Sequence, residues 1–335
     1  MESAADFKRR LIRQAGLSRS IVEAAWPDWW SDEADASASA KTELRFSVAR
    51  KLGLDPRTLL DDQTPGWIWE DAARFKSFRG DVLGHQPAIS SFGMALGRML
   101  LSASEPPLAW LPSNTSAATI REMLLRTRPS IGLPELLQLA WTLGIPVIHL
   151  RTYPLSAKQM SAMSVRIGDR FVIFLAKDSQ YPAPSAFHLA HELGHIVLDH
   201  LASGQSIVDF GGLGDPDDEE DVEEQAADGF AMELLTGEPE LQFQIAGGGR
   251  NARELADQAL RAEAELQIEP GMLALAYGHF TRNWDTAMAS LRHIYPRPYP
   301  VWEAVNTIAG RRIDWSEMDD ESESYLRAVM GGLNG

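Results

Sequence analysis

The pattern that most constrains this chain is His191-Glu192-Leu193-Gly194-His195, in which two histidines lie four residues apart and a glutamate follows the first. Apolar residues recur around it at helical spacing, which predicts a buried α-helix. Side chains four apart on a helix have Cβ atoms roughly 5–6 Å apart, so both imidazoles can reach one Zn²⁺. Histidine and glutamate are costly to bury without a partner or a metal. We therefore predict a zinc site in which Glu192 is the general base toward water.

A hydrolytic zinc site needs a third protein ligand and one open position. A nearby third histidine, as in the pattern H-E-x-x-H-x-x-G-x-x-H, is absent because Leu198 and Leu201 occupy the glycine and histidine positions. His200 lies five residues after His195, which is an awkward place from which to reach the same metal. We therefore expect the third ligand farther along the chain.

A second predicted helix, residues 221–235, offers this ligand. Its apolar residues follow a three-four spacing, and Glu224 and Asp228 lie one turn apart on one side. We predict that Glu224 ligates the metal and that Asp228 accepts the N–H of a zinc-bound histidine. Glu223 is the rival for the ligand position. The alternative interpretation of these acidic residues is a solvated helix start, where the helix dipole favours carboxylates.

The two helices together carry a resemblance to a known family. Residues 187–195 read F-H-L-A-H-E-L-G-H, and residues 224–235 read E-x-x-A-D-x-F-A-x-E-L-L. In this order the motifs resemble the ImmA/IrrE family of zinc metallopeptidases, over about residues 130–236. The resemblance implies a gluzincin-like site with three zinc ligands and one base, namely His191, His195, Glu224 and Glu192. It also implies that the substrate is a helix-turn-helix repressor encoded nearby and cleaved in a stress or mobile-element response.

Some positions depart from the family pattern. Asp228 replaces the usual asparagine but still offers an oxygen, and His188 stands where threonine is common. The family often has a histidine four residues after the second ligand, where this chain has Asp199 and then His200. From the helices that follow the motifs, Tyr277 and His279 are candidates to stabilise the transition state as hydrogen-bond donors. For both residues, a structural role is the alternative.

We predict an α+β fold that is mostly helical, with a small three-stranded sheet packed against the zinc-binding helix. The expected strands are 145–150, 162–167 and 170–176, and Gly168-Asp169 is a tight-turn signal between the last two. The 335 residues are long enough for several units. The expected units are a helical, helix-turn-helix-like module (1–62), a helical connecting region (63–128), a zinc metallopeptidase domain with C-terminal helices over residues 252–266 and 271–295 (129–300), and an acidic C-terminal tail (301–335).

Charge bears on what the first unit can bind. Residues 47–60 resemble the last two helices of a phage-repressor-type helix-turn-helix domain. However, residues 1–62 hold eleven acidic and ten basic residues, and the whole chain has a net charge of −16. Because binding to phosphates requires an excess of basic charge, DNA binding is not expected, and a degenerate module that docks a protein is favoured.

Two features of the sequence bear on the cellular compartment of the protein and on the access of substrates to its site. The chain has no cysteine, which excludes disulfides and thiolate metal sites and fits a cytoplasmic protein, and no run of about 18 apolar residues predicts a membrane span. Eight acidic residues lie between Asp215 and Glu224. They form either a solvated loop or a lid that favours basic substrates.

The sequence thus predicts a zinc-dependent endopeptidase. The alternative is a non-proteolytic regulator that senses metal or binds DNA and keeps a vestigial peptidase domain. Intact Glu192 favours the enzyme, because a metal sensor needs the ligands but not the base.

Overall fold

The computed structural model describes residues 1–61, 63–76, 86–107, 111, 115–155, 160–210, 221–243 and 251–332. The fold is α+β and mostly helical, as predicted. The predicted acidic block lies outside the described residues except for its last part, which begins helix α9. In the described part of the chain, no helix combines the length and the apolar character needed to cross a bilayer.

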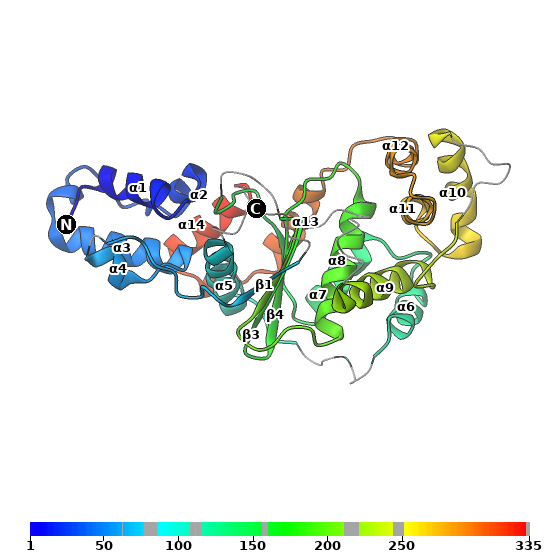
Figure 1. Ribbon diagram of the computed structural model, residues 1–335, viewed down its shortest axis with the longest axis horizontal. Helices are drawn as coiled ribbons and strands as arrows, with labels where there is room; N and C mark the ends of the chain where they lie inside the picture. Colours follow the sequence, from blue (N-terminus) through cyan, green and yellow to red (C-terminus); the bar gives the residue numbers. More distant parts are fainter. Residues whose placement is uncertain are drawn as a thin grey trace.

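One mixed sheet stands at the centre of the molecule (Figure 1). Its strand order is β1-β5-β3-β4-β2; β3 is antiparallel to β4 and β5, whereas β1 and β2 run parallel to their neighbours. The strands are β1 (Ala73–Lys76), β2 (Val147–His149), β3 (Ala162–Ile167), β4 (Arg170–Leu175) and β5 (Ser206–Asp209). The prediction of three strands was therefore too low, because β1 and β5 are four-residue strands without a strong β pattern.

The predicted hairpin is confirmed. Ile167 pairs with Arg170 across the two-residue turn, and Gly168 adopts a left-handed φ of 60° that glycine tolerates without strain. Side chains alternate along β4, so Phe171, Ile173 and Leu175 join one hydrophobic core while Val172 and Phe174 join another. Burial on both faces explains why this strand is apolar without interruption.

The first of the two cores contains the peptidase motifs. It lies between one face of the sheet and a group of helices that includes α8 (Figure 1). These helices are α6 (Ala117–Leu125), α7 (Leu133–Thr142), α8 (Pro182–Val197), α9 (Val222–Thr236), α10 (Ala252–Leu266), α11 (Pro270–Thr281) and α12 (Trp284–Ile294). The predicted helix over 271–295 is divided, because Arg282 adopts a left-handed φ of 57° and Asn283 caps the N-terminus of α12.

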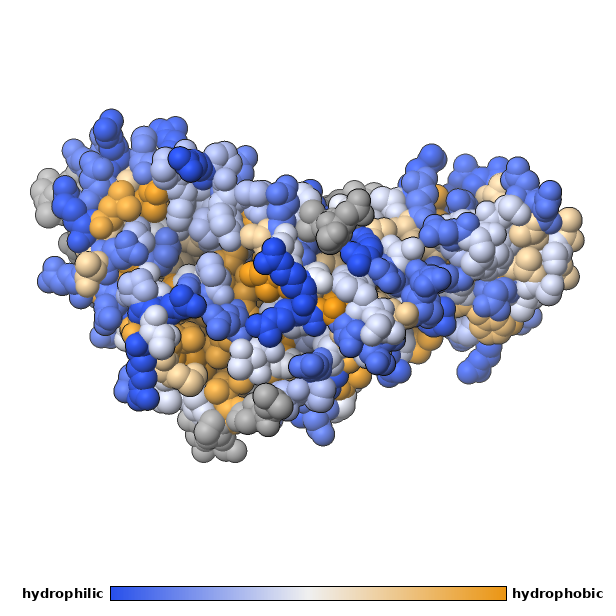
Figure 2. Space-filling view, turned by 180° about the vertical axis from the view of Figure 1, so that it is seen from behind, coloured by the Kyte–Doolittle hydropathy of each residue, from blue (hydrophilic) through white to orange (hydrophobic). Residues whose placement is uncertain are grey.

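The second core joins both ends of the chain to the opposite face of the sheet (Figure 1). Its helices are α1 (Ala4–Arg13), α2 (Arg19–Ala24), α3 (Ala38–Leu52), α4 (Pro56–Leu60), α5 (Gln86–Ser102), α13 (Val301–Arg312) and α14 (Asp320–Val329), with short 3₁₀ turns at Ala34–Ala36 and Trp315–Glu317. Tyr325, Leu326 and Val329 are fully buried in it. The segment expected to be an acidic tail is therefore packed as two helices. From behind, hydrophobic residues show mainly over the middle and over the half of the molecule that contains the first core (Figure 2).

Candidate metal centre

Helix α8 presents its polar residues toward the sheet and α9. Pro182 stands in its first turn, where a missing N–H costs nothing, and the helix ends at Val197. His191, Glu192 and His195 are all buried, and the glutamate and second histidine have no exposed surface. Ionisable groups so deeply buried need partners, which α9 and the sheet supply.

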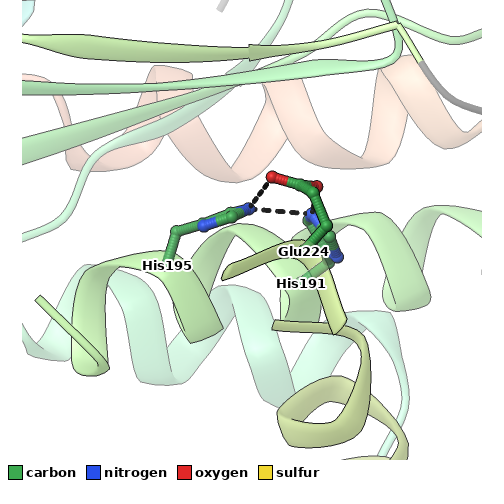
Figure 3. Close-up of side chains that lie close together, drawn as sticks. All are labelled: His191, His195 and Glu224. Atoms are coloured by element: carbon green, nitrogen blue, oxygen red, sulfur yellow. Dashed lines mark hydrogen bonds and ion pairs between the residues drawn. The ribbon is translucent and has the colours of Figure 1, made fainter. Parts of the chain in front are cut away.

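Three side chains converge from the two helices (Figure 3). The Nε2 atoms of His191 and His195 lie 3.0 Å apart, and Glu224 Oε2 lies 3.2 Å from His191 Nε2. Glu224 Oε1 lies 3.4 Å from His195 Nε2. Two ligands held at about 2.0–2.1 Å in a tetrahedral arrangement are roughly 3.3 Å apart. The three side chains therefore form a buried group that fits a metal ion.

The close approach of α9 to α8 depends on Gly194. A Cβ atom at this position would lie 3.2 Å from the carbonyl oxygen of Ala227 and from the ring of Phe230, which is tighter than ordinary van der Waals contact. Asp221 caps the N-terminus of α9 by accepting from the amides of Glu223 and Glu224. Cap and glycine together hold Glu224 over the two histidines.

The Nδ1 atoms of His191 and His195 also have hydrogen-bond partners. Nδ1 of His191 lies 2.8 Å from Asp228 Oδ1, as the sequence led us to expect. Nδ1 of His195 lies 2.9 Å from Nδ1 of His200. His200 therefore contacts the side of the His195 ring that faces away from Glu224, an arrangement that its sequence spacing did not predict. Such partners fix the tautomer that leaves Nε2 free to ligate.

Glu192 points to the sheet rather than to α9. Its Oε2 accepts a short hydrogen bond from the hydroxyl of Ser164 on β3. Its Oε1 is buried and has no hydrogen-bond partner among the described residues. Ser164 was not identified from the sequence; its only signal was a small polar residue between two apolar residues of a predicted strand. The free oxygen is where a base must receive a proton.

The charged groups of the site shift one another's pKa values. Burial raises the pKa of Glu192 to about 8. Burial also opposes protonation of His191, but hydrogen bonds to Asp228 and Glu224 outweigh it and hold the pKa of this histidine well above 6.5. Burial raises the pKa of Glu224, but the hydrogen bonds from both histidines dominate and lower it.

A link to β1 was not predicted either. Arg74 Nη1 lies 2.8 Å from Glu223 Oε2, and its other terminal nitrogen donates to the carbonyl of His200. Glu223, the rival ligand, therefore faces this arginine. Arg74 thereby ties β1 to α9, the helix that carries Glu224, and to His200, which contacts His195.

The remaining predicted site residues lie on α11. Tyr277 is buried in the hydrophobic core, and His279 is exposed near the end of the helix. Among the interactions in the described part of the chain, none joins either side chain to the three converging residues. Their predicted contribution to the transition state remains a prediction.

Comparison with known proteins agrees with this geometry. Residues 142–265 match the model of a peptidase family described as the IrrE N-terminal-like domain. Over these residues the chain is thus similar to this family, which confirms the resemblance to the ImmA/IrrE metallopeptidases. No curated protein and no solved structure matches the chain. The matched segment includes α8, α9 and four of the five strands, whereas β1 lies outside it.

Replacing Asp228 by alanine is expected to weaken zinc binding by roughly 10–100-fold, the usual effect of removing a partner that orients a ligating histidine. Asp228→Asn should bind almost as well as the parent, because its amide oxygen can still accept from Nδ1 of His191. Competition with a chromophoric zinc chelator measures both affinities. Equal affinity of the alanine variant and the parent would show that His191 needs no such partner.

Proposed function

We propose that this protein is a zinc-dependent endopeptidase that hydrolyses peptide bonds in a partner protein. One observation carries the proposal: a buried His-His-Glu group with a glutamate beside it that has one oxygen free, inside a domain of a peptidase family. We assign His191, His195 and Glu224 as the ligands and Glu192 as the base. The test is whether the zinc-loaded protein cleaves a purified helix-turn-helix repressor encoded beside its gene.

The residues of the chain would divide the chemistry among them. A bound zinc ion would act as a Lewis acid toward water and the peptide carbonyl. Glu192 accepts the proton of the attacking water on its free oxygen, while Ser164 holds the other oxygen in place. The same carboxyl group then delivers the proton to the amine that leaves. Asp228 and His200 keep the two imidazoles oriented throughout.

The sheet suggests how an extended substrate would bind. If only the segment that matches the family model is considered, β5 is an edge strand of the sheet. In the whole fold, β1 pairs with β5 over four residues and takes the edge position. The outermost strands of the described sheet are β1 and β2, and of these β1 is tied to the metal centre through Arg74. A peptide that adds a strand to this sheet would therefore lie along β1.

The identity of the partner rests on the family resemblance. ImmA/IrrE-like peptidases imply a repressor-type transcription regulator as substrate, cleaved in a stress or mobile-element response, and the protein would act in the cytoplasm. The rival is a metal-sensing or DNA-binding regulator without peptidase activity. The hydrogen bond that positions Glu192 favours the enzyme, since neither rival function needs an oriented base.

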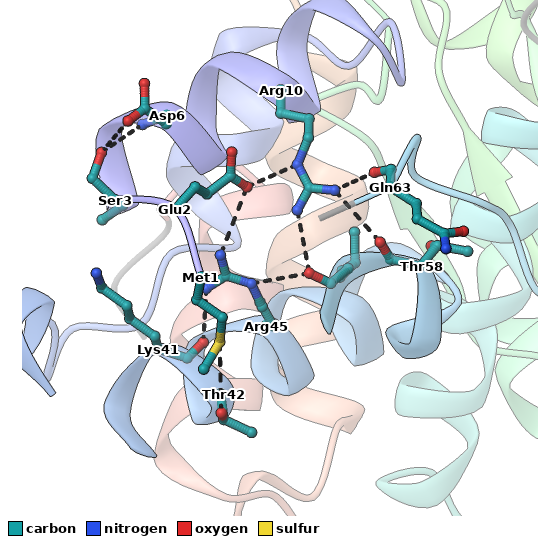
Figure 4. Close-up of polar contacts among 12 residues, drawn as sticks. Met1, Glu2, Ser3, Asp6, Arg10, Lys41, Thr42, Arg45, Thr58 and Gln63 are labelled. Atoms are coloured by element: carbon teal, nitrogen blue, oxygen red, sulfur yellow. Dashed lines mark hydrogen bonds and ion pairs between the residues drawn. The ribbon is translucent and has the colours of Figure 1, made fainter. Parts of the chain in front are cut away.

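Part of the basic charge of the first unit lies inside the fold, where it cannot contact DNA. Arg10 and Arg45 are buried and donate to backbone carbonyls within the protein (Figure 4). Lys51 is also buried and donates to the carbonyl of Ala25. Glu2 pairs with both arginines, and Glu321 of α14 lies 3.2 Å from the Lys51 ammonium. Three of the ten basic residues in this unit are thus used inside the fold. We infer that the unit docks a protein rather than DNA.

The full-length protein is therefore expected to show no tight DNA binding. A module that contacts phosphates would bind strongly at low salt and lose affinity steeply as salt rises. Gel shift with random duplex DNA at low and moderate salt measures this. Tight, salt-sensitive retention would refute the docking role and favour the DNA-binding rival. Deletion of residues 1–62 would disrupt the second core, which they share with the sheet and α14. The test therefore uses the full-length protein.

A further inference from the structure

A second buried polar pair lies beside the metal centre. His188 is on α8, three residues before His191 and four before Glu192, so all three lie on one face of the helix. Its side chain is 93% buried, and its Nδ1 lies 3.8 Å from Asp209 Oδ2 at the end of β5. Ile207 packs in the core that contains α8. Asp209 is two residues farther along the same strand, so its side chain points to the same face of the sheet and toward α8.

The position of this pair places it within the site. The Asp209 carboxylate is close enough to act electrostatically on both His191 and Glu192. Nε2 of His188 is buried and has no hydrogen-bond partner among the described residues. Leaving such an atom unsatisfied costs free energy, so native folds seldom keep one without a partner.

The chemistry of Nε2 follows from its surroundings. Burial lowers the pKa of His188 to about 3, so the ring is neutral and has one donor and one acceptor nitrogen. The negative charge of the Asp209 carboxylate, 3.8 Å from Nδ1, favours a proton on that nitrogen. Nε2 then presents a lone pair. The threonine common at this position in the family would not offer a ring acceptor.

We propose that Nε2 of His188, oriented by Asp209, accepts a hydrogen bond from a donor of the peptide substrate next to the cleaved bond. The donor is either a backbone amide or a side-chain N–H. His188 would thus be a specificity-determining residue. The proposal rests on the proposed peptidase function, because it places a substrate in this site.

Peptide hydroxamates test the proposal, since their chelating group fixes them to the zinc-loaded protein. The probe is a lysine-containing tripeptide hydroxamate, compared with forms N-methylated at each backbone amide and with a norleucine form. Inhibitor affinity is measured for the parent, His188→Gln, His188→Leu and Asp209→Asn. Glutamine at position 188 keeps an acceptor oxygen, and leucine removes it. Asparagine at position 209 removes the negative charge that favours a proton on Nδ1 of His188. Zinc content of each variant is the control, because none of these residues is an assigned ligand.

One modification, either N-methylation or norleucine, should weaken binding to the parent by roughly 3–10-fold, the effect of one hydrogen bond. This difference should persist in His188→Gln and vanish in His188→Leu and Asp209→Asn. N-methylation as the effective change identifies a backbone donor, and norleucine a side-chain donor. If the differences do not depend on residue 188, the proposal is overturned. If the zinc-loaded parent binds no hydroxamate, the peptidase function itself fails.

Discussion

Replacing Glu192 by glutamine is expected to abolish cleavage while the protein keeps its fold and about one zinc per chain. Glutamine has nearly the same shape, and its amide oxygen can still accept from Ser164, so the buried side chain stays in place. It cannot take up a proton at neutral pH. General base catalysis alone contributes roughly 10²–10⁴-fold, so the rate should fall at least by that factor.

The rate is measured on a cognate partner protein, with zinc content determined on the same samples. Glu254→Gln is the matched control, because this glutamate is exposed on α10 and outside the metal centre. Cleavage by Glu192→Gln at the rate of the parent would remove Glu192 from the role of base.

Replacing Glu224 by alanine is expected to release most of the zinc. The loss of affinity should exceed the roughly 10–100-fold effect of losing a supporting partner, because a ligand itself is removed. Since zinc binds the folded state, the parent should melt at a higher temperature with zinc than after chelation, and the variant should lose this difference. Elemental analysis and thermal unfolding measure the two effects.

Glu223→Ala provides the control for this variant. It removes a neighbouring carboxylate that pairs with Arg74, and because this pair is more than a third exposed, its loss should cost less than about 1 kcal/mol. Zinc content should remain that of the parent. Retention of zinc in Glu224→Ala together with loss in Glu223→Ala would move the ligand by one residue.

The helical part of the site could be predicted because helix geometry is local. Spacing alone put His191 and His195 on one face, and the periodicity of residues 221–235 put Glu224 and Asp228 on one side of a second helix. Strand β4 and the hairpin were also recognisable, because an apolar run and a Gly-Asp turn are local signals. These features required no knowledge of how distant segments meet.

The missing parts depend on contacts between distant segments. Ser164 meets Glu192 only because β3 packs against α8, and Arg74 reaches Glu223 across 149 positions of sequence. β1 and β5 are too short to be recognised without their pairing. Nothing in the sequence indicates that arginines of the first unit are buried, and only the fold shows that Arg10 and Arg45 donate to backbone carbonyls.

Zinc titration into metal-stripped protein tests the central claim most directly, with cleavage of the helix-turn-helix protein encoded beside the gene as the readout. We predict no cleavage before zinc is added and a rise that saturates at about one zinc per chain, as expected for a single three-ligand catalytic site. Full cleavage by the metal-stripped protein, or no cleavage after about one zinc per chain has bound, would contradict the assignment of this site as a zinc peptidase centre.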